Sequence, residues 1–517
     1  MARAAGQEPG SGWKVGGAVA RFKMSRRQVL THGVTAAGAL VTGSAATVAV
    51  SRWAGQGEIP AASPSGALLD DASRLNPTAV RGVLFAESSA AATTQAVTPL
   101  LRRIAAGEDP PLAIAGVRHS MGRQSLLPGG WVLDTRPMNE VSLDSAAGVV
   151  RVGAGATWRE IIPVLNAAGF APKVMQSNHD FTVGGSLSVN CHGWHANHPP
   201  IAASVRSLRL LTATGDVITC NPTENVEQFG LVLGGYGMFG LILDADLDVW
   251  PNAMYRPHFT TVPTRDYATT FARQVRAEGS RVEMAYGRLS VDPRNFLAEA
   301  ILVAFAPDPD TRGAVLPLTS PAMPELQRAV FRNSAGSDLG KMLRWSVERE
   351  MAPWLAGPLS RNSILNEPAA VFADQSTATR DILHEYFVPQ QRLWDFVEKA
   401  RGIIERGRVE LLNVTVRDVR QDRRTALAYA RQDVFGLVMN FRQEGTSEAE
   451  DRMRALTREL IDAAIDVDGT FYLPYRLHGT GAQLRRAYPT WAGVVAAKRR
   501  LDPREVFRNE LYNSYAG

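Results

Sequence analysis

Cysteine is almost absent from this sequence, and neither sign of charge is in strong excess. Only Cys191 and Cys220 occur among 517 residues, so the chain can build neither a disulfide framework nor a four-cysteine zinc site. Lys and Arg number 56 against 51 Asp and Glu, and the formal net charge of +5 gives no support to nucleic-acid binding. A hydrophobic content of 45% is typical of a globular protein, and the length indicates about two or three domains.

Charged residues are also missing from one stretch near the N-terminus. Ser25-Arg26-Arg27-Gln28-Val29-Leu30 is a twin-arginine pattern, and the 24 residues from Gln28 to Ser51 contain no Lys, Arg, Asp or Glu. This predicts export of the folded protein by the twin-arginine route, to the periplasm or outside the cell, which suits an enzyme that binds a bulky cofactor first. The alternative is an uncleaved membrane anchor, because a stretch of this length could just span about 30 Å of hydrocarbon. We assign residues 1–64 to the signal and a linker.

The rest of the chain divides into a strand-rich part and a part with longer helices, which predicts an α+β protein of two domains. Residues 65–252 alternate short strands with helical patterns, such as the capping box from Thr157 to Glu160. Residues 253–480 place amphipathic helices, clearest from Gln390 to Arg406, between extended segments. Residues 481–517 form a tail in which a short closing helix is expected over 499–507. The strand candidates of the second part, expected to form an antiparallel sheet backed by helices, are Val282 to Val291, Ala300 to Phe305, Asp381 to Val388, Arg408 to Arg417, Val434 to Phe441 and Thr470 to Tyr475.

One glycine-rich segment has the spacing of a dinucleotide-binding motif. It is Gly235-Tyr236-Gly237-Met238-Phe239-Gly240. In the dinucleotide-binding fold a strand precedes these glycines and a helix follows them. Here a helical stretch precedes them and the strand-like segment Leu241 to Asp246 follows. The context therefore favours a tight glycine turn over a Rossmann fold.

Two other loops combine glycine with polar residues. The first, Ala115-Gly116-Val117-Arg118-His119-Ser120-Met121-Gly122, follows an apolar run and can surround an anion with main-chain N–H groups, a hydroxyl and a cation. Taken alone, its histidine would be an ordinary loop histidine. The second, Phe181 to Gly193, contains Gly184-Gly185, where the missing Cβ atoms let a flat ring lie against the main chain.

Together the three motifs resemble those of flavoproteins of the vanillyl-alcohol oxidase and p-cresol methylhydroxylase type, which have an FAD-binding PCMH-type domain. GVRHSMGRQSLLPGGWVLD is similar to the matching stretch of cytokinin dehydrogenases, and TVGGSLSVNCHG with LLTATGDVITC resembles decaprenylphosphoryl-ribose oxidases. YLPYRLHGTGAQLRRAYP and LDPREVF look like the family's C-terminal signature. The resemblance implies an FAD domain split between residues 65–252 and the tail 481–517, with a substrate (cap) domain at 253–480.

The resemblance also implies roles for individual residues toward FAD. The pyrophosphate would be held by Gly116, Arg118, Ser120 and Gly122; the flavin would be lined by Ser177, Thr182, Gly184, Gly185, Ser188 and His192; and the adenosine part would pack on Gly235, Gly237, Gly240 and Ile242. Tyr472 would approach the isoalloxazine ring. His119 occupies the position at which many members bond covalently to the flavin 8α carbon, which requires a neutral imidazole. Cys191 does not occupy the position of a second attachment and is interpreted as a small pocket residue.

The expected reaction is transfer of a hydride from a CH–OH carbon of a small sugar-, sterol- or polyol-like substrate to flavin N5, while a base removes the hydroxyl proton, or the amine proton if an amine is oxidised. Cytokinin dehydrogenases have an aspartate where this chain has Ser177, so that base is absent. The C-terminal segment also lacks the H-W-x-K pattern of sugar-lactone oxidases. The candidate catalytic residues are Arg417, Tyr472, Tyr475 and Glu385, with His384 behind them. Oxygen or another carrier would accept the electrons.

Two other classes of function stay open at this point. His192, His195 and His198 could form the metal site of a hydrolase, although no carboxylate lies within the cluster and we predict no metal. A binding protein that keeps the fold without flavin chemistry is the second alternative.

Overall fold

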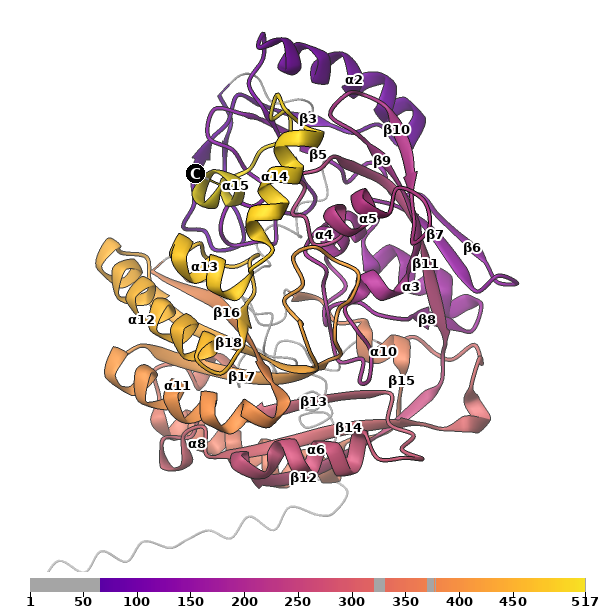
Figure 1. Cartoon of the computed structure of the whole chain (residues 1–517). Coiled ribbons are helices and arrows are strands. Elements are labelled where there is room, and N and C mark those ends of the chain that lie inside the picture. The colour runs from indigo at the N-terminus through magenta and orange to yellow at the C-terminus, as the bar shows by residue number, and fades with distance from the viewer. Residues whose placement is uncertain (1–65, 320–330, 370–375, 377, 517) are drawn as a thin grey trace, which may run out of the picture.

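The computed structural model describes residues 66–319, 331–369, 376 and 378–516. The twin-arginine pattern lies outside this range. None of the described helices has the length and apolar character needed to cross a membrane. Two blocks of sheet, one indigo to magenta and the other rose to orange in Figure 1, pack against each other, and the yellow C-terminal helices lie beside the indigo strands.

The first part contains two sheets and a short antiparallel pair. The pair is β1 (Leu68–Leu69) and β2 (Thr78–Ala79). A parallel sheet has the order β3-β5-β4, comprising Gly82–Phe85, Trp131–Asp134 and Leu112–Ala115, and α2 (Ala90–Ala106) precedes β4. The larger antiparallel sheet has the order β10-β9-β11-β7-β6, and β8 pairs with the end of β11. Its strands are β6 (Val141–Asp144), β7 (Val149–Gly153), β8 (Phe170–Pro172), β9 (Val205–Leu211), β10 (Val217–Cys220) and β11 (Leu241–Pro251).

Short helices of the first part connect these strands. The capping box predicted at Thr157 starts α3 (Trp158–Ala167), with the Glu160 carboxylate accepting from the Thr157 N–H at 2.7 Å. α4 (Val183–Ser188) begins after Thr182, and α5 (Val226–Val232) precedes the glycine motif at 235–240. β11 follows that motif directly, as the sequence context predicted.

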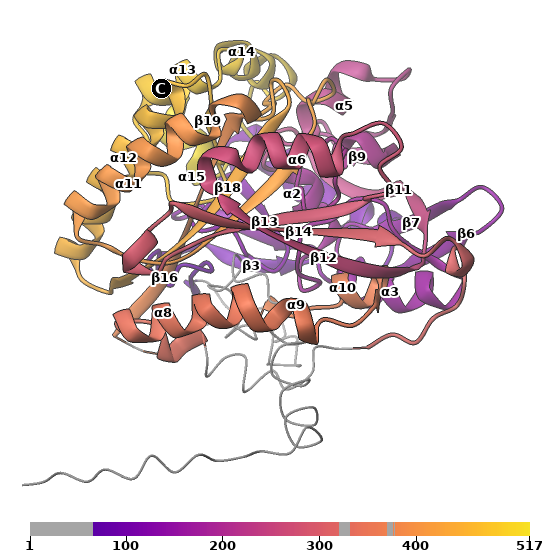
Figure 2. The same cartoon turned by 90° about the horizontal axis from the view of Figure 1, so that it is seen from below.

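The second part is built on one eight-stranded antiparallel sheet with the order β15-β12-β14-β13-β17-β18-β16-β19. The helices α6 (Tyr267–Val275), α11 (Leu393–Gly407) and α12 (Ser447–Ile465) cover its outer face (Figure 2). The inner face is directed at the first part, because Tyr286 of β13 stacks on Trp194 at 4.6 Å between ring centroids. The strands are β12 (Met254–Pro263), β13 (Met284–Leu289), β14 (Glu299–Pro307), β15 (Leu359–Ser360), β16 (Thr379–Pro389), β17 (Glu410–Val419), β18 (Val434–Glu444) and β19 (Thr470–Phe471). A further helical segment comprises α8 (Asp338–Ser346), a π-helical turn (Val347–Met351), α9 (Ala352–Leu355) and, after β15, α10 (Arg361–Leu365).

The tail returns to the first part through α13 (Gly481–Ala487), α14 (Trp491–Leu501) and α15 (Glu510–Tyr515). The Leu112 N–H donates to the Val506 carbonyl at 2.8 Å, which joins the tail to the edge of β4. The closing helix predicted over 499–507 is wrong, because α14 ends at Leu501. Asp502 precedes Pro503, which disfavours helical backbone, and its carboxylate accepts from the N–H groups of Val506 and Phe507 instead.

Candidate active site

An elongated cavity lies between the two parts of the molecule and is lined by both. Its empty space is about 1270 Å³, counting solvent at its mouth. The lining includes most of the predicted residues: Gly116, Arg118, His119, Ser120, Ser177, Thr182, Gly184, Gly185, Ser188, His192, Gly237, Gly240, Ile242, Glu385, Arg417, Tyr472 and Tyr475. The fold therefore brings residues from six separate segments of the chain to one site.

Two predicted cofactor residues, Gly122 and Gly235, do not line this cavity. A Cβ atom at Gly122 would lie 2.5 Å from the Tyr475 carbonyl oxygen, and one at Gly235 would lie 2.0 Å from the Leu231 carbonyl oxygen. Glycine is therefore needed at both positions because a main-chain carbonyl oxygen lies too close to leave room for a Cβ atom. Gly237, in contrast, lines the cavity in a left-handed conformation with φ of +75°, and nothing within 3.6 Å would meet its Cβ.

The loop after β4 offers uncommitted main-chain donors. Arg118 adopts a left-handed conformation with φ of +54°, which turns the backbone sharply. Within the described chain, the N–H groups of Val117, His119 and Ser120 donate to no protein acceptor. Buried or half-buried amides normally have partners, so this loop fits an anion such as a pyrophosphate.

A nearby carboxylate partly compensates the positive charge of Arg118. Its guanidinium is buried and lies 3.9 Å from the Asp134 carboxylate, which also binds Arg136. Burial lowers the pKa of Arg118 from its ordinary value, and Asp134 opposes that shift. Arg118 therefore contributes a partly neutralised cation to the cavity.

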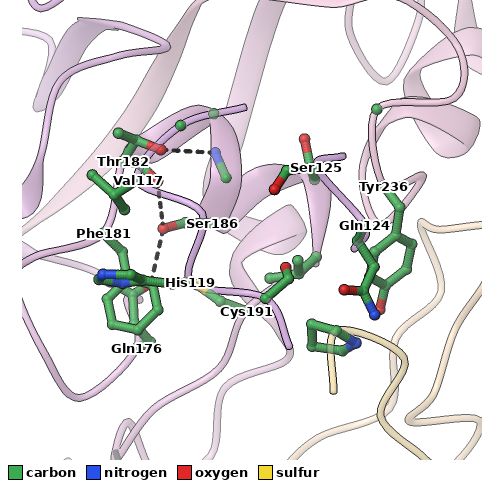
Figure 3. Close-up of a pocket in the computed structure, with 18 of the residues that line it drawn as sticks. Val117, His119, Gln124, Ser125, Gln176, Phe181, Thr182, Ser186, Cys191 and Tyr236 are labelled. Carbon is green, nitrogen blue, oxygen red and sulfur yellow. Dashed lines mark hydrogen bonds between the residues drawn. The ribbon is translucent and has the colours of Figure 1, made fainter. Parts of the chain in front are cut away.

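His119 is held as a neutral imidazole. Burial lowers its pKa to about 3, and its ring lies edge-on to Phe181 at 4.3 Å between centroids. Its Nδ1 atom is buried and has no hydrogen-bond partner among the described residues. Figure 3 shows this ring beside Phe181 and Gln176 at the cavity wall. A neutral ring with a free nitrogen is the form that a nucleophile toward the flavin needs.

The segment opposite this loop leaves its main chain accessible. Thr182 caps α4 by accepting from the Gly185 N–H, and Ser186 donates to Gln176 at 2.8 Å, as drawn in Figure 3. A Cβ atom at Gly184 would lie 2.9 Å from Ala154, so this glycine is needed for packing of α4. At Gly185 only the Thr182 hydroxyl would be near, and the cavity side is open. The Ser177 hydroxyl oxygen is buried in the same wall without a partner in the described chain.

The eight-stranded sheet of the second part, called the cap sheet below, contributes a carboxylate that lies against His192. Glu385 of β16 and His192 are both deeply buried, and His192 Nε2 lies 2.7 Å from Glu385 Oε1. The two atoms are close enough for a hydrogen bond but not aligned for a straight one, so each keeps bonding capacity for a ligand. The other Glu385 oxygen accepts from the Tyr475 hydroxyl at 3.2 Å. This pair can exchange a proton with a bound substrate.

Arg417 of β17 is a buried cation without a carboxylate within 4 Å in the described chain. Its Nη1 donates weakly to the His192 carbonyl oxygen at 3.5 Å, and its Nε has no partner there. A buried guanidinium with so few partners is costly unless a ligand supplies acceptors. The predicted substrate-side position of Arg417 is therefore physically reasonable.

Tyr472 lines the cavity, but its hydroxyl is already used. It donates to the Val189 carbonyl oxygen at 2.8 Å, and burial raises the pKa of Tyr472 well above its ordinary value. Its ring packs within 6 Å of His192, Tyr429 and Tyr475. The geometry suits a wall against which a ring can lie better than it suits a base.

His384 lies on the outer face of the sheet, since neighbouring strand residues alternate in direction. Its Nε2 contacts the Thr457 hydroxyl of α12 at 3.3 Å, away from the cavity. The three histidines of the proposed metal cluster also diverge: His192 faces Glu385 and His198 packs edge-on against Trp250. The described residues contain no group of three ligands able to hold a metal, so nothing supports a metal-dependent hydrolase.

Several cavity residues were not predicted from the sequence. They are mainly Gln124, Ser125, Gln176, Tyr236 and Leu383. Gln176 and Ser125 adjoin predicted residues in polar loops, and this was the only signal available for them. Cys191 does line the cavity, and burial raises the pKa of its thiol to about 12, so it stays protonated.

Comparison with known proteins agrees with this geometry. Residues 90–221, which include both glycine-containing loops, match the family model described as FAD binding domain. Cytokinin dehydrogenase 7 of Oryza sativa subsp. japonica is 35% identical over 190 residues, covering 34% of this chain and 35% of the relative. Cytokinin dehydrogenase 6 of the same plant is also 35% identical, over 31% of this chain and 32% of the relative. The chain thus matches about a third of the length of these relatives.

A bacterial relative aligns over a longer range. The protein named "Uncharacterized oxidoreductase ORF5 in fasciation locus" of Rhodococcoides fascians is 25% identical over 417 residues, which cover 78% of this chain and 87% of the relative. These matches and the model confirm the predicted resemblance and the α+β fold class.

Proposed function

We propose that this chain, whose residues 90–221 match the family model described as FAD binding domain, is an FAD-dependent oxidoreductase acting on a CH–OH donor. One observation carries the proposal: the His192–Glu385 pair faces the cavity that the FAD-type loops line. The main-chain N–H groups of Val117, His119 and Ser120, which have no acceptor in the described chain, and the open main chain at Gly185 fit FAD. Bound FAD supplies a hydride acceptor at its N5 atom.

The protein's own part of the reaction is to accept a proton. A bound flavin would take the hydride from the substrate carbon, and the His192–Glu385 pair would accept the hydroxyl proton, so that a carbonyl product forms. His192 Nε2 lies beside Glu385, so its Nδ1 atom, which has no partner in the described chain, is available as an acceptor. Tyr475 donates to Glu385 and holds the carboxylate in place. Arg417 stabilises the oxygen as its proton leaves.

The attachment of FAD through His119 belongs to the same proposal. The low pKa of about 3 and the unpartnered Nδ1 atom support it. Export by the twin-arginine route, with or without cleavage of the signal, would place the reaction outside the cytoplasm. Oxygen or another carrier outside the cytoplasm would then reoxidise the flavin.

Anaerobic mixing of the purified holoprotein with alcohols tests the proposal directly. Bleaching of the yellow absorbance is expected with a CH–OH substrate. Glu385→Gln should slow bleaching by about 10²-fold to 10³-fold with unchanged FAD content. Glu398→Gln on the exposed side of α11 is the control and should react like the wild type. Bleaching by amines alone, or a Glu385→Gln rate within about threefold of wild type, would contradict the proposal.

A further inference from the structure

The inner face of the cap sheet stays polar beyond the cavity wall formed by Leu383, Glu385 and Arg417. We call Arg288 of β13, Asn413 of β17 and Asn440 of β18 the polar row. All three are buried, Asn440 at 0% and Asn413 at 1% exposure. None belongs to the proton-accepting pair, and none was predicted from the sequence.

The strand register places the polar row beside the cavity wall. Asn440 is paired with Leu383 on one side and with Asn413 on the other. Glu385 is paired with Val438, which makes Asn440 its diagonal neighbour, at about 7–8 Å. Arg288 is paired with Thr415 and is likewise the diagonal neighbour of Arg417. Asn440 therefore lies about 7–8 Å from Glu385, and Arg288 lies about as far from Arg417, which is roughly the length of a small molecule.

The polar row has hydrogen-bonding capacity that the described protein does not use. Both side-chain amide atoms of Asn440, the Asn413 oxygen and Arg288 Nη1 have no partner among described residues. The other Arg288 nitrogen, Nη2, binds the Glu348 carboxylate at 3.0 and 3.1 Å, so its charge is compensated and one donor group remains. Leaving a buried amide unsatisfied costs about 1–3 kcal/mol. Residues of this kind are expected to meet a ligand or ordered water.

We propose that the substrate is a hydroxyl-rich molecule, a linear polyol or a sugar, and that the polar row binds hydroxyl groups remote from the reacting carbon. This inference rests on the proposed function and specifies its substrate. A hydroxyl both donates and accepts, which matches the amide oxygen and N–H groups of Asn440, the amide oxygen of Asn413 and the spare Nη1 donors of Arg288. An apolar sterol or prenyl group placed here would leave these atoms unsatisfied and would bind poorly.

The first experiment follows flavin bleaching and the flavin spectrum of the anaerobic holoprotein with linear polyols of increasing length. The reference substrates are benzyl alcohol and a prenylated adenine. The apparent KM is expected to fall by about tenfold or more from the shortest to the longest polyols, since each added hydroxyl gains a partner. If polyols neither bleach nor perturb the flavin while benzyl alcohol bleaches it, the inference is overturned and the proposed function stands. If no alcohol bleaches the flavin, the proposed function fails.

The second experiment separates substrate binding from a structural role. Asn440→Leu and Asn413→Leu keep a similar volume but remove the amides, so KM for a long polyol should rise about 10-fold to 100-fold with little change in kcat. Thermal stability should not fall in Asn440→Leu, because an amide without partners in the described chain is removed, whereas Asn413→Leu also removes the hydrogen bond from Asn413 Nδ2 to the Thr415 hydroxyl at 3.2 Å. Asn362→Leu is the matched control, since this fully buried amide donates to Asn166 and to the Phe170 carbonyl oxygen, and it should lower Tm. If Asn440→Leu lowers Tm like Asn362→Leu and leaves KM unchanged, only internal water uses the polar row and the inference is wrong.

Discussion

The protonation state of a single histidine controls the proposed attachment of the flavin. Because burial lowers the pKa of His119 to about 3, the ring is neutral wherever the protein is folded near neutral pH. His119→Ala should therefore yield a protein whose yellow colour passes into the supernatant after acid precipitation. In the wild type the colour should stay with the polypeptide. Attachment to the apoprotein should also show no loss of rate from about pH 8 to about pH 5.5, unlike that of an ordinary histidine.

His198→Ala provides the control for this prediction. His198 belongs to the same histidine-rich region, packs against Trp250 and does not line the cavity. Its replacement should leave the flavin attached. If the His119→Ala polypeptide keeps its yellow colour, the flavin must be bonded to another residue, and the role given to His119 is refuted.

A glycine in the cap sheet makes room for Glu385, the proposed catalytic carboxylate. A Cβ atom at Gly436 would lie 2.9 Å from Phe387 and 3.0 Å from Glu385 Oε1. Gly436→Ala should push the carboxylate away from His192 and slow flavin bleaching by about tenfold, at a stability cost of about 1 kcal/mol. Stopped-flow rates and thermal melts measure the two effects. Gly493→Ala, on α14 with nothing within 4 Å, should raise stability and leave the rate unchanged.

At the scale of elements, the segment after β19 that carries Tyr472 and Tyr475 is held by one acidic residue of α12. Glu450 accepts from Arg476 and from His478 Nε2, the latter at 2.8 Å. Arg476 also donates to the Asn76 side chain at 2.6 Å, which ties the same segment to the first part. This network fixes the wall of the cavity although it lies outside it.

The Glu450 network predicts a pH-dependent stability. Burial alone would raise the pKa of Glu450, but the hydrogen bond from His478 and the charge of Arg476 lower it far below its ordinary value. The folded state therefore binds its proton less readily than the unfolded state, and the stabilisation is present above about pH 4.5 and is lost on further acidification. Glu450→Gln should cost about 2 kcal/mol at neutral pH and progressively less below pH 4 or so. Denaturant titrations at several pH values measure this. A constant difference across that range would exclude the ionised carboxylate as the cause.

The sequence predicted elements better than it predicted contacts between them. Strands β16, β17 and β18 followed from apolar patterns, and Tyr472 was placed near the flavin because the C-terminal motif resembles a known one. Glu385 and Arg417 were substrate-side candidates outside that motif. The contact of His192 with Glu385 could not be predicted, since it joins residues 193 positions apart through packing of two sheets. Asn413 and Asn440 gave no signal either, because an asparagine in a strand pattern is usually interpreted as solvent-exposed.

At the scale of the whole molecule, the site exists only where the two parts and the tail meet. The cavity is lined by residues 114–242 of the first part and by 383–475 of the second. The tail supports the first part from outside the cavity, since the Asn509 side chain donates to the Tyr236 carbonyl oxygen at 2.6 Å. Asn509→Ala should consequently weaken FAD binding without touching the cofactor, and the flavin content of the purified protein measures this effect. Full flavin content in Asn509→Ala would show that the turn at Tyr236 keeps its shape unaided.

Because FAD would contact both parts, its removal should lower the stability of both parts rather than that of one sheet. The His119→Ala protein permits the test, since its FAD is expected to be removable. Adding FAD to that apoprotein at about 100 times its Kd should stabilise the fold by about 2.7 kcal/mol, and Tm should rise with FAD concentration. Calorimetry should also show the apoprotein unfolding over a broader range than the loaded form, because the direct contacts between the parts, such as Arg361 with the Pro172 and Lys173 carbonyl oxygens, remain but the shared ligand is absent. A Tm independent of added FAD would mean that the cavity does not bind the dinucleotide, and the proposed function would fall with it.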